Sequence, residues 1–298
     1  MTGTQRPSMQ PLYRNFETQA QIDTQYNPSL ALAAGDNPMQ HFARRAVEAR
    51  STLQNSLDVP YGPTLAETLD IFPADTPNAP VFVFVHGGYW RALSSKDFSG
   101  IALGLHALGI TAVVVNYALC PYVIIDEIVR QTRAACAWVV RNIAQHGGDP
   151  SRVAIGGHSA GGHLCAMALQ TEWARDYGLP QNPFAAAILV SGLYDLALLR
   201  YSYLQPMIQL DEATVRRCSP AFNVRPCATP LWITWGGAES SEFAHQSELY
   251  YGAWLALGNQ ALLEEQPHAN HFTAIHGFES PSSPICQWLN NTLKGTVP

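Results

Sequence analysis

Residues 153–163 read VAIGGHSAGGH, an apolar run that ends in glycines surrounding one serine, Ser159. The apolar residues predict a buried strand, and the glycines predict a sharp turn into a helix. Gly157 and Gly161 complete a G-x-S-x-G pattern, in which small neighbours allow a strained serine at the apex of the turn. A short pattern of this kind also occurs by chance, so the surrounding sequence decides whether it marks a catalytic serine. Ser159 is the candidate nucleophile.

A second glycine-rich loop lies upstream of this turn. Residues 81–85 read VFVFV, which predicts a fully buried strand, and residues 86–90 read HGGYW. Acyl transfer requires N–H groups aimed at the oxygen that becomes negatively charged, and glycines let a backbone approach that oxygen closely. We therefore expect an oxyanion hole here, although a simple strand-to-helix turn is the alternative. The candidate donors are the backbone N–H groups of Gly87, Gly88, Tyr89 and Ala160.

A serine hydroxyl needs a neighbouring base, and two histidines follow the last predicted strand. His271 directly precedes an apolar, periodic run at residues 272–278, where a loop leads into the final helix. His268 follows Pro267 and is more typical of a surface turn. We therefore predict that His271 is the base.

An acid that orients the base is expected between the serine and the histidine. Glu239 follows residues 231–237, which read LWITWGG and predict another buried strand that ends in glycines. Carboxyl ends of strands in open α/β sheets collect functional groups. Glu239 can alternatively complement the dipole of a helix that begins near Ser240. Asp195, after the strand at residues 185–191, is the competing acid, and we favour Glu239.

Four residues are candidates for substrate contact. They lie in the oxyanion loop, beside the nucleophile and in an aromatic segment at residues 193–224, and they are Tyr89, Trp90, His158 and Tyr194. Packing in the interior is the alternative for His158 and for the aromatic segment, because aromatic residues dominate protein cores.

The order of elements predicts an α/β fold. Strand-like runs occur at residues 67–72, 81–85, 111–116, 153–157, 185–191, 231–235 and 261–265. They alternate with helical patterns, the longest at residues 124–145. This alternation predicts a mostly parallel sheet with helices on both faces. We expect one domain over residues 1–298, with a small cap formed by residues 1–60 and by a lid insertion at residues 193–224.

Composition limits the classes of partner. The 298 residues carry a net charge of −6 and only 13% charged side chains, and they contain no cluster of Lys and Arg, so neither nucleic acid nor a membrane is an expected partner. A small-molecule substrate is expected instead, and the low charge allows for a homodimer. Six cysteines without paired spacing, and an N-terminus without an apolar leader, predict a cytoplasmic protein. We expect no metal and no cofactor, because no cluster of ligands has metal spacing.

With these motifs assembled, residues 60–295 resemble the α/β-hydrolase superfamily in its hormone-sensitive-lipase-like branch. The loop at residues 86–90 is similar to the H-G-G-x-W form of kynurenine formamidases rather than to the H-G-G-G of typical esterases. Further similar stretches are NY at residues 116–117 with Pro121, GHSAG at residues 157–161, GAESSEF at residues 237–243 and NHF at residues 270–272.

The resemblance implies Ser159 as nucleophile, Glu239 as acid and His271 as base. One departure is that formamidases usually have aspartate where Glu239 stands, which changes the reach of the carboxylate. The resemblance also implies a serine hydrolase that cleaves formyl or acetyl from an aryl amide or ester, because Tyr89 replaces the third glycine and narrows the acyl side. A general carboxylesterase is the alternative, and a non-catalytic hydrolase-fold binding protein is a remote one.

Overall fold

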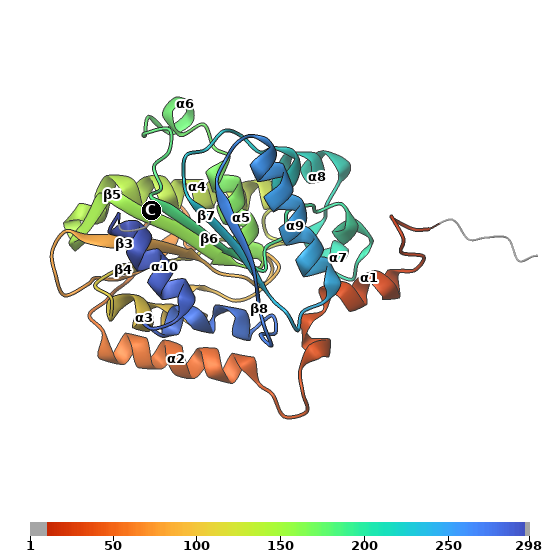
Figure 1. The fold of residues 1–298 in the computed structure, drawn as a ribbon, viewed down its shortest axis with the longest axis horizontal. Coiled ribbons are helices and arrows are strands. Elements are labelled where there is room, and N and C mark those ends of the chain that lie inside the picture. The colour runs from red at the N-terminus through yellow and green to blue at the C-terminus, as the bar shows by residue number, and fades with distance from the viewer. Residues whose placement is uncertain (1–10, 296–298) are drawn as a thin grey trace, which may run out of the picture.

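An eight-stranded, mostly parallel sheet forms the centre of the computed structural model, which describes residues 11–295 (Figure 1). The strand order is β1-β2-β4-β3-β5-β6-β7-β8, and only β2 runs antiparallel to its neighbours. The strands are β1 (Ser56–Pro60), β2 (Thr68–Phe72), β3 (Ala79–Val85), β4 (Thr111–Val115), β5 (Gly148–His158), β6 (Ala186–Val190), β7 (Leu231–Gly236) and β8 (Ala261–Gln266).

Helices cover both faces of this sheet, with α4, α5, α8 and α9 on one side and α2, α3 and α10 on the other (Figure 1). The α-helices are α1 (Gln19–Tyr26), α2 (Pro38–Thr52), α3 (Ala102–His106), α4 (Ile125–Asn142), α5 (Ala160–Leu169), α6 (Trp173–Tyr177), α7 (Gln205–Ile208), α8 (Glu212–Cys218), α9 (Ser241–Ala256) and α10 (Pro284–Leu293). Short 3-10 helices are η1 (Pro28–Ala31), η2 (Ser95–Asp97), η3 (Ser99–Ile101), η4 (Ile143–His146), η5 (Leu198–Tyr201), η6 (Pro220–Phe222) and η7 (Thr273–Glu279).

The central strands explain the continuous apolar runs of the sequence. On β3, Val81, Val83 and Val85 belong to the buried cluster on one face, whereas Phe82 and Phe84 belong to the cluster on the other. All five side chains are buried because both faces are covered by helices. Their apolar character thus follows from their central position, and the predicted fold class is confirmed.

The predicted strands are all present, with ends that differ by a few residues. The largest difference is β5, which begins at Gly148 rather than at residue 153. The predicted helix at residues 124–145 is split into α4 and η4. The prediction missed β1, because its residues are mostly exposed, include Pro60 and show no alternation. Residues 56–60 are therefore an edge strand rather than part of a cap.

The N-terminal segment crosses from one side of the molecule to the other. α1 contacts α9 and η5, while α2 packs beneath the sheet against η2 and η3 (Figure 1). The end of α1, the connection between these helices at residues 27–37 and the start of α2 reach the carboxyl edge of the sheet. The first ten residues, where no leader is expected, lie outside the described residues. Within residues 11–295, none of the helices combines the length and apolar character needed to cross a membrane.

Candidate active site

Ser159 stands at the sharp turn between β5 and α5. Its backbone has φ 56° and ψ −120°, a conformation that is strained for a residue with a side chain. The backbone N–H of Ser159 donates to the carbonyl of Val190 on the next strand, at 2.8 Å. The structure thus gives residues 153–163 the strand, turn and helix that the sequence predicts.

Two glycines of this turn are required by close packing. A Cβ on Gly161 would lie 1.9 Å from the carbonyl oxygen of Val85, at the end of β3. A Cβ on Gly157 would lie 2.5 Å from the carbonyl group of Gly161. Backbone atoms cannot move aside as flexible side chains can. This turn therefore requires glycine at both positions of the G-x-S-x-G pattern.

His271 and Glu239 form a buried pair at the ends of β8 and β7. The Nδ1–H of His271 donates to Oε2 of Glu239 at 2.6 Å, and the two side chains are 6% and 1% exposed. The other carboxylate oxygen accepts the N–H of Gly236 at 2.6 Å and the hydroxyl of Ser191. These three hydrogen bonds hold the Glu239 carboxylate in its orientation toward the His271 imidazole.

The competing acid, Asp195, lies elsewhere. Its Oδ1 accepts the N–H of Ala197 at 2.9 Å within its own turn, and burial raises the pKa of its carboxyl. Among the described residues, His271 forms its ion pair with Glu239 and not with Asp195. His268 is exposed in a turn with φ 64°, in agreement with its interpretation as a surface residue.

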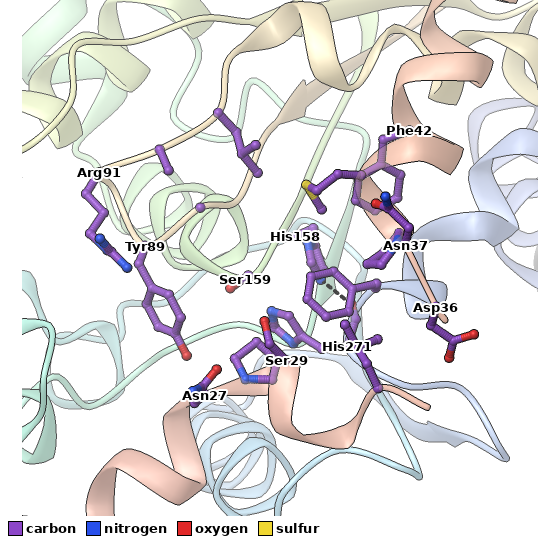
Figure 2. Close-up of a pocket in the computed structure, with 18 of the residues that line it drawn as sticks. Asn27, Ser29, Asp36, Asn37, Phe42, Tyr89, Arg91, His158, Ser159 and His271 are labelled. Carbon is purple, nitrogen blue, oxygen red and sulfur yellow. Dashed lines mark hydrogen bonds between the residues drawn. The ribbon is translucent and has the colours of Figure 1, made fainter. Parts of the chain in front are cut away.

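Ser159 and His271 line one cavity of about 430 Å³. Figure 2 shows both side chains near its centre, with Tyr89 and Arg91 on one side and Asp36 on the other. Within residues 11–295, no hydrogen bond joins the Ser159 hydroxyl to His271. Hydrogen bonds of this kind are often long in hydrolases without substrate and shorten when it binds.

The loop after β3 lies directly against the nucleophile. A Cβ on Gly87 would lie 3.2 Å from the Cβ of Ser159, so the backbone of Gly87 passes close to the serine. The next residues, Gly88, Tyr89 and Trp90, all have positive φ, at 108°, 49° and 56°. Within the described chain, the N–H groups of Gly87, Gly88, Tyr89 and Ala160 have no protein acceptor. Of these residues, Gly88 and Tyr89 also line the cavity.

Two predicted substrate contacts are wrong. Trp90 is fully buried and donates its Nε1–H to Nδ1 of His163 at 3.2 Å, so it points into the core. Tyr194 is also fully buried, and its ring stacks on Tyr250 with 4.5 Å between centroids. Neither side chain lines the cavity, whereas Tyr89 and His158 do. In both corrections, packing against interior aromatic residues determines the direction of the ring.

The N-terminal segment supplies most of the lining that the sequence analysis did not name. The added residues are Asn27, Pro28, Ser29, Leu32, Asp36, Asn37, Pro38, Met39 and Phe42, together with Arg91, Ala92, Leu93, Phe98, Tyr203 and Phe272. The carbonyl of Tyr26 accepts the hydroxyls of Tyr89, at 2.6 Å, and Tyr203, at 3.2 Å. The predicted cap therefore contributes through residues 27–42 and, from the lid insertion, through Tyr203. No motif marked these positions, because their contacts join segments far apart in sequence.

Burial determines the charge state of the histidines around the site. Burial is the main cause that lowers the pKa of His158, and the nearby His271 lowers it further. Burial also lowers the pKa of His86 and of His163 to about 4. All three rings are consequently neutral near pH 7.

One group of side chains within residues 11–295 has metal-binding spacing, and it lies outside the cavity. His41, His276 and Glu279 offer ligand atoms within 4.8 Å of one another. The Glu279 carboxylate already binds His41 at 3.0 Å and the Nε of Arg45 at 2.8 Å. The Arg45 charge opposes a second cation at this place, and the two ion pairs join α2 to η7.

Comparisons with known proteins find a matching family model and several relatives. A family model described as the alpha/beta hydrolase fold matches residues 82–222. Kynurenine formamidase of Danio rerio is 31% identical over 268 residues, which cover 86% of this chain and 89% of the relative. Carboxylesterase NlhH of Mycobacterium tuberculosis is 38% identical over 128 residues, which cover 42% of this chain and 39% of the relative.

Solved structures give the same result for the fold. A putative thioesterase from Silicibacter sp. TM1040 superimposes with a TM-score of 0.78 and 26% identity, over 89% of this chain and 97% of that chain. An esterase of Pyrobaculum calidifontis superimposes with a TM-score of 0.70 over 91% of this chain and 98% of that one. Its 17% identity supports the fold alone.

Proposed function

The chain belongs to the α/β-hydrolase family together with the kynurenine formamidases, and it is a serine hydrolase; we propose that it cleaves formyl or acetyl from an aryl amide or ester. The observation that carries the proposal is the buried Glu239–His271 pair, whose His271 lines one cavity with a serine held at a strained turn. These residues supply the acid, base and nucleophile of acyl transfer.

In the first half-reaction, the Ser159 hydroxyl attacks the carbonyl carbon while Nε2 of His271 takes its proton. Glu239 stabilises the positive imidazole that forms. The carbonyl oxygen becomes negative and is stabilised by the N–H groups of Gly88, Tyr89 and Ala160, which lack protein acceptors. The bond to the leaving group then breaks, and His271 returns the proton to the departing nitrogen or oxygen.

In the second half-reaction, water replaces the leaving group. His271 takes a proton from the water as its oxygen attacks the acyl carbon, and a second negative oxygen occupies the same N–H groups. The ester bond to Ser159 breaks, the serine regains its proton, and formate or acetate is released. Every step uses the chain's own residues, and the proposal includes neither a metal nor a cofactor.

The small acyl group is proposed from the position of Tyr89. Its ring lines the cavity, and the hydroxyl bond to the carbonyl of Tyr26 fixes it there. A fixed ring leaves a longer acyl chain little room, and overpacking costs about 1–3 kcal/mol. The kynurenine formamidase relatives support the amide substrate. A general short-chain carboxylesterase is the second candidate, and the NlhH relative favours it.

Turnover of a substrate panel tests the proposal. Aryl esters of formyl, acetyl, butyryl and hexanoyl should show kcat/KM falling by about tenfold to a hundredfold as the chain lengthens. An N-formyl arylamine should be cleaved at a rate comparable to its ester. Preference for the hexanoyl ester contradicts the small acyl pocket. If esters are hydrolysed but no amide is, the result supports the alternative, a general carboxylesterase.

The variant Tyr89→Gly tests the cause of this preference. Glycine adopts the positive φ of Tyr89 without strain, so the substitution removes the ring with little change to the backbone. It should raise kcat/KM for butyryl and hexanoyl esters relative to acetyl. Tyr203→Phe is the control, because it loses the same kind of bond to Tyr26 but keeps its ring. Unchanged acyl selectivity in Tyr89→Gly contradicts the proposal.

We also propose a cytoplasmic location, which the six free cysteines support. A small-molecule substrate is supported by the size of the cavity. A homodimer stays a prediction, which sedimentation velocity can test.

A further inference from the structure

We propose that His158 is a positioning residue, which holds the backbone of His271 beside Ser159. The inference rests on the proposed function, because it assumes that His271 is the base for Ser159. His158 lies at the end of β5, immediately before the nucleophile, and its Nε2 is 2.8 Å from the backbone oxygen of His271. Figure 2 shows this contact as the dashed line beside Ser159.

The tautomer of His158 follows from its partner. A carbonyl oxygen only accepts hydrogen bonds, so Nε2 of His158 carries the proton and donates it. Burial favours the neutral ring, and the neighbouring His271 favours it further. The Nε2–H bond to the His271 carbonyl therefore persists across the neutral pH range in which a serine hydrolase uses a neutral base.

The loop that carries His271 has few links to the strand of the nucleophile. Asn270 and Thr273 bind each other within the loop, and the carbonyl of Ala269 accepts the N–H of Ala238 after β7. In the described part of the chain, a single hydrogen bond joins residues 267–272 to residues 153–159, and it is the bond from His158. It joins the backbone of the base to the residue covalently next to the nucleophile.

The hydrogen bond from His158 also helps to fix the position of His271 relative to Ser159. The side chain of His271 is fixed by Glu239, but that bond alone leaves the imidazole free to move together with β7 and β8. No direct hydrogen bond connects the Ser159 hydroxyl to His271 in the described residues, so their separation is set by the surrounding backbone. Misplacement of reacting groups by about 1 Å can cost 10²-fold in rate.

Phenylalanine is a selective substitution at this position. Nδ1 of His158 is buried and has no hydrogen-bond partner among the described residues, so His158→Phe keeps an aromatic side chain and loses one hydrogen bond, the bond to His271. In His158→Gln, the side-chain amide can donate a proton from a position similar to Nε2. Glutamine should therefore restore the bond that phenylalanine removes.

His163 provides a matched control on the next helix. It is also fully buried, and its Nε2 donates to a backbone carbonyl, that of Cys218, at 2.7 Å. Its Nδ1 accepts the Nε1–H of Trp90, so His163→Phe loses two bonds and should destabilise the fold more than His158→Phe. Within the described residues, neither a hydrogen bond nor a ring contact joins His163 to His271.

The experiment compares the full chain with His158→Phe, His158→Gln and His163→Phe. We expect kcat for an aryl acetate to fall by about 10–100-fold in His158→Phe, with a smaller change in KM, because the base is misplaced while an aromatic ring still lines the cavity. His158→Gln should recover most of kcat. His163→Phe should lower Tm more but keep kcat within about threefold of the unmodified protein.

Two results overturn the inference. One is an unchanged kcat in folded His158→Phe, and the other is a loss of kcat in His163→Phe as large as in His158→Phe. If His158→Phe does not fold, two other variants decide. Full activity in His158→Leu contradicts the inference, and so does a folded His158→Gln whose kcat stays below 10% of that of the unmodified protein. The proposed function fails separately, when Ser159→Ala retains hydrolysis.

Discussion

The carboxylate of Glu239 shows how single residues complete this site. Glutamate is one methylene longer than aspartate, and its extra reach lets one oxygen accept the N–H of Gly236 and the hydroxyl of Ser191 while the other binds His271. A Cβ on Gly236 would lie 2.3 Å from the carbonyl of Ala269, so the loop of the acid and the loop of the base are in close contact. The departure from aspartate is thus compatible with a well-oriented acid.

Glu239→Gln and Asp195→Asn distinguish the two acids. Gln keeps the size of the side chain but removes the charge that stabilises the positive His271, so kcat should fall by about 10²–10⁴-fold. Asp195→Asn should change kcat by less than about threefold, because the Asp195 carboxylate accepts the N–H of Ala197 in its own turn and, among the described residues, forms no ion pair with His271. Steady-state hydrolysis of an aryl acetate measures both. A larger loss in Asp195→Asn contradicts the assignment of the acid.

Motifs predicted the reacting residues better than the side chains around them. Ser159 and His271 are recognisable because the chemistry fixes their order and their neighbours, and the elbow glycines must be small for steric reasons. Trp90 lies in the same motif as Tyr89, yet its ring points into the core toward His163. Backbone dihedrals and interior packing determine that direction, and a sequence motif contains neither.

The N-terminal helix α1 matters because it fixes the wall of the cavity. Glu242, at the start of α9, is 4% exposed and accepts both terminal nitrogens of Arg14 at 3.1 Å and the hydroxyl of Tyr26 at 3.2 Å. The carbonyl of Tyr26 in turn holds Tyr89. This network connects α9 to the lining of the site.

Glu242→Gln should weaken the network without touching the reacting residues. Loss of the charge leaves Arg14 and Tyr26 imperfectly paired, so the free energy of unfolding should fall by about 1–3 kcal/mol. KM should rise more than kcat falls, because the wall formed by residues 27–42 loosens. Urea unfolding and steady-state kinetics measure the two effects.

Glu212→Gln is the control for this prediction. Glu212 pairs with Arg216 on α8, where both side chains are more than two-thirds exposed, so its loss should cost less than about 0.5 kcal/mol. Equal stability and equal KM in the two variants contradict the role of the network.

Elements were predictable where one strand or helix carries its own pattern. The buried strands β3, β5 and β7 have continuous apolar runs, and α4 has a single apolar stripe, so each was found from the sequence. The cap was predictable only as a segment. The bonds that dock it, such as Arg14 to Glu242, join residues 228 positions apart and leave no local signal.

At the scale of the whole molecule, buried neutral histidines make stability depend on pH. Burial lowers the pKa of His86 and of His163 to about 4, whereas an unfolded histidine has a pKa near 6.5. Below about pH 6.5 the unfolded chain binds protons that the folded chain does not, so stability present at pH 7 is lost as the pH falls toward 4.

Each of these two histidines should lower the free energy of unfolding by about 2 kcal/mol between about pH 7 and pH 5. Urea unfolding at both pH values measures the change. His163→Phe, although less stable at pH 7, should lose about 2 kcal/mol less over this interval than the unmodified protein. A steeper or equal pH dependence in His163→Phe contradicts the prediction.

The most direct test of the account is reaction with a fluorophosphonate, which forms a covalent bond with an activated serine hydroxyl. The account predicts one adduct per chain, located by peptide mass spectrometry on Ser159. It also predicts that Ser159→Ala gains no adduct and loses at least about 10³-fold in hydrolysis with unchanged circular dichroism, since the substitution removes one oxygen and no core volume. An adduct on another residue, or hydrolysis retained by folded Ser159→Ala, would contradict it.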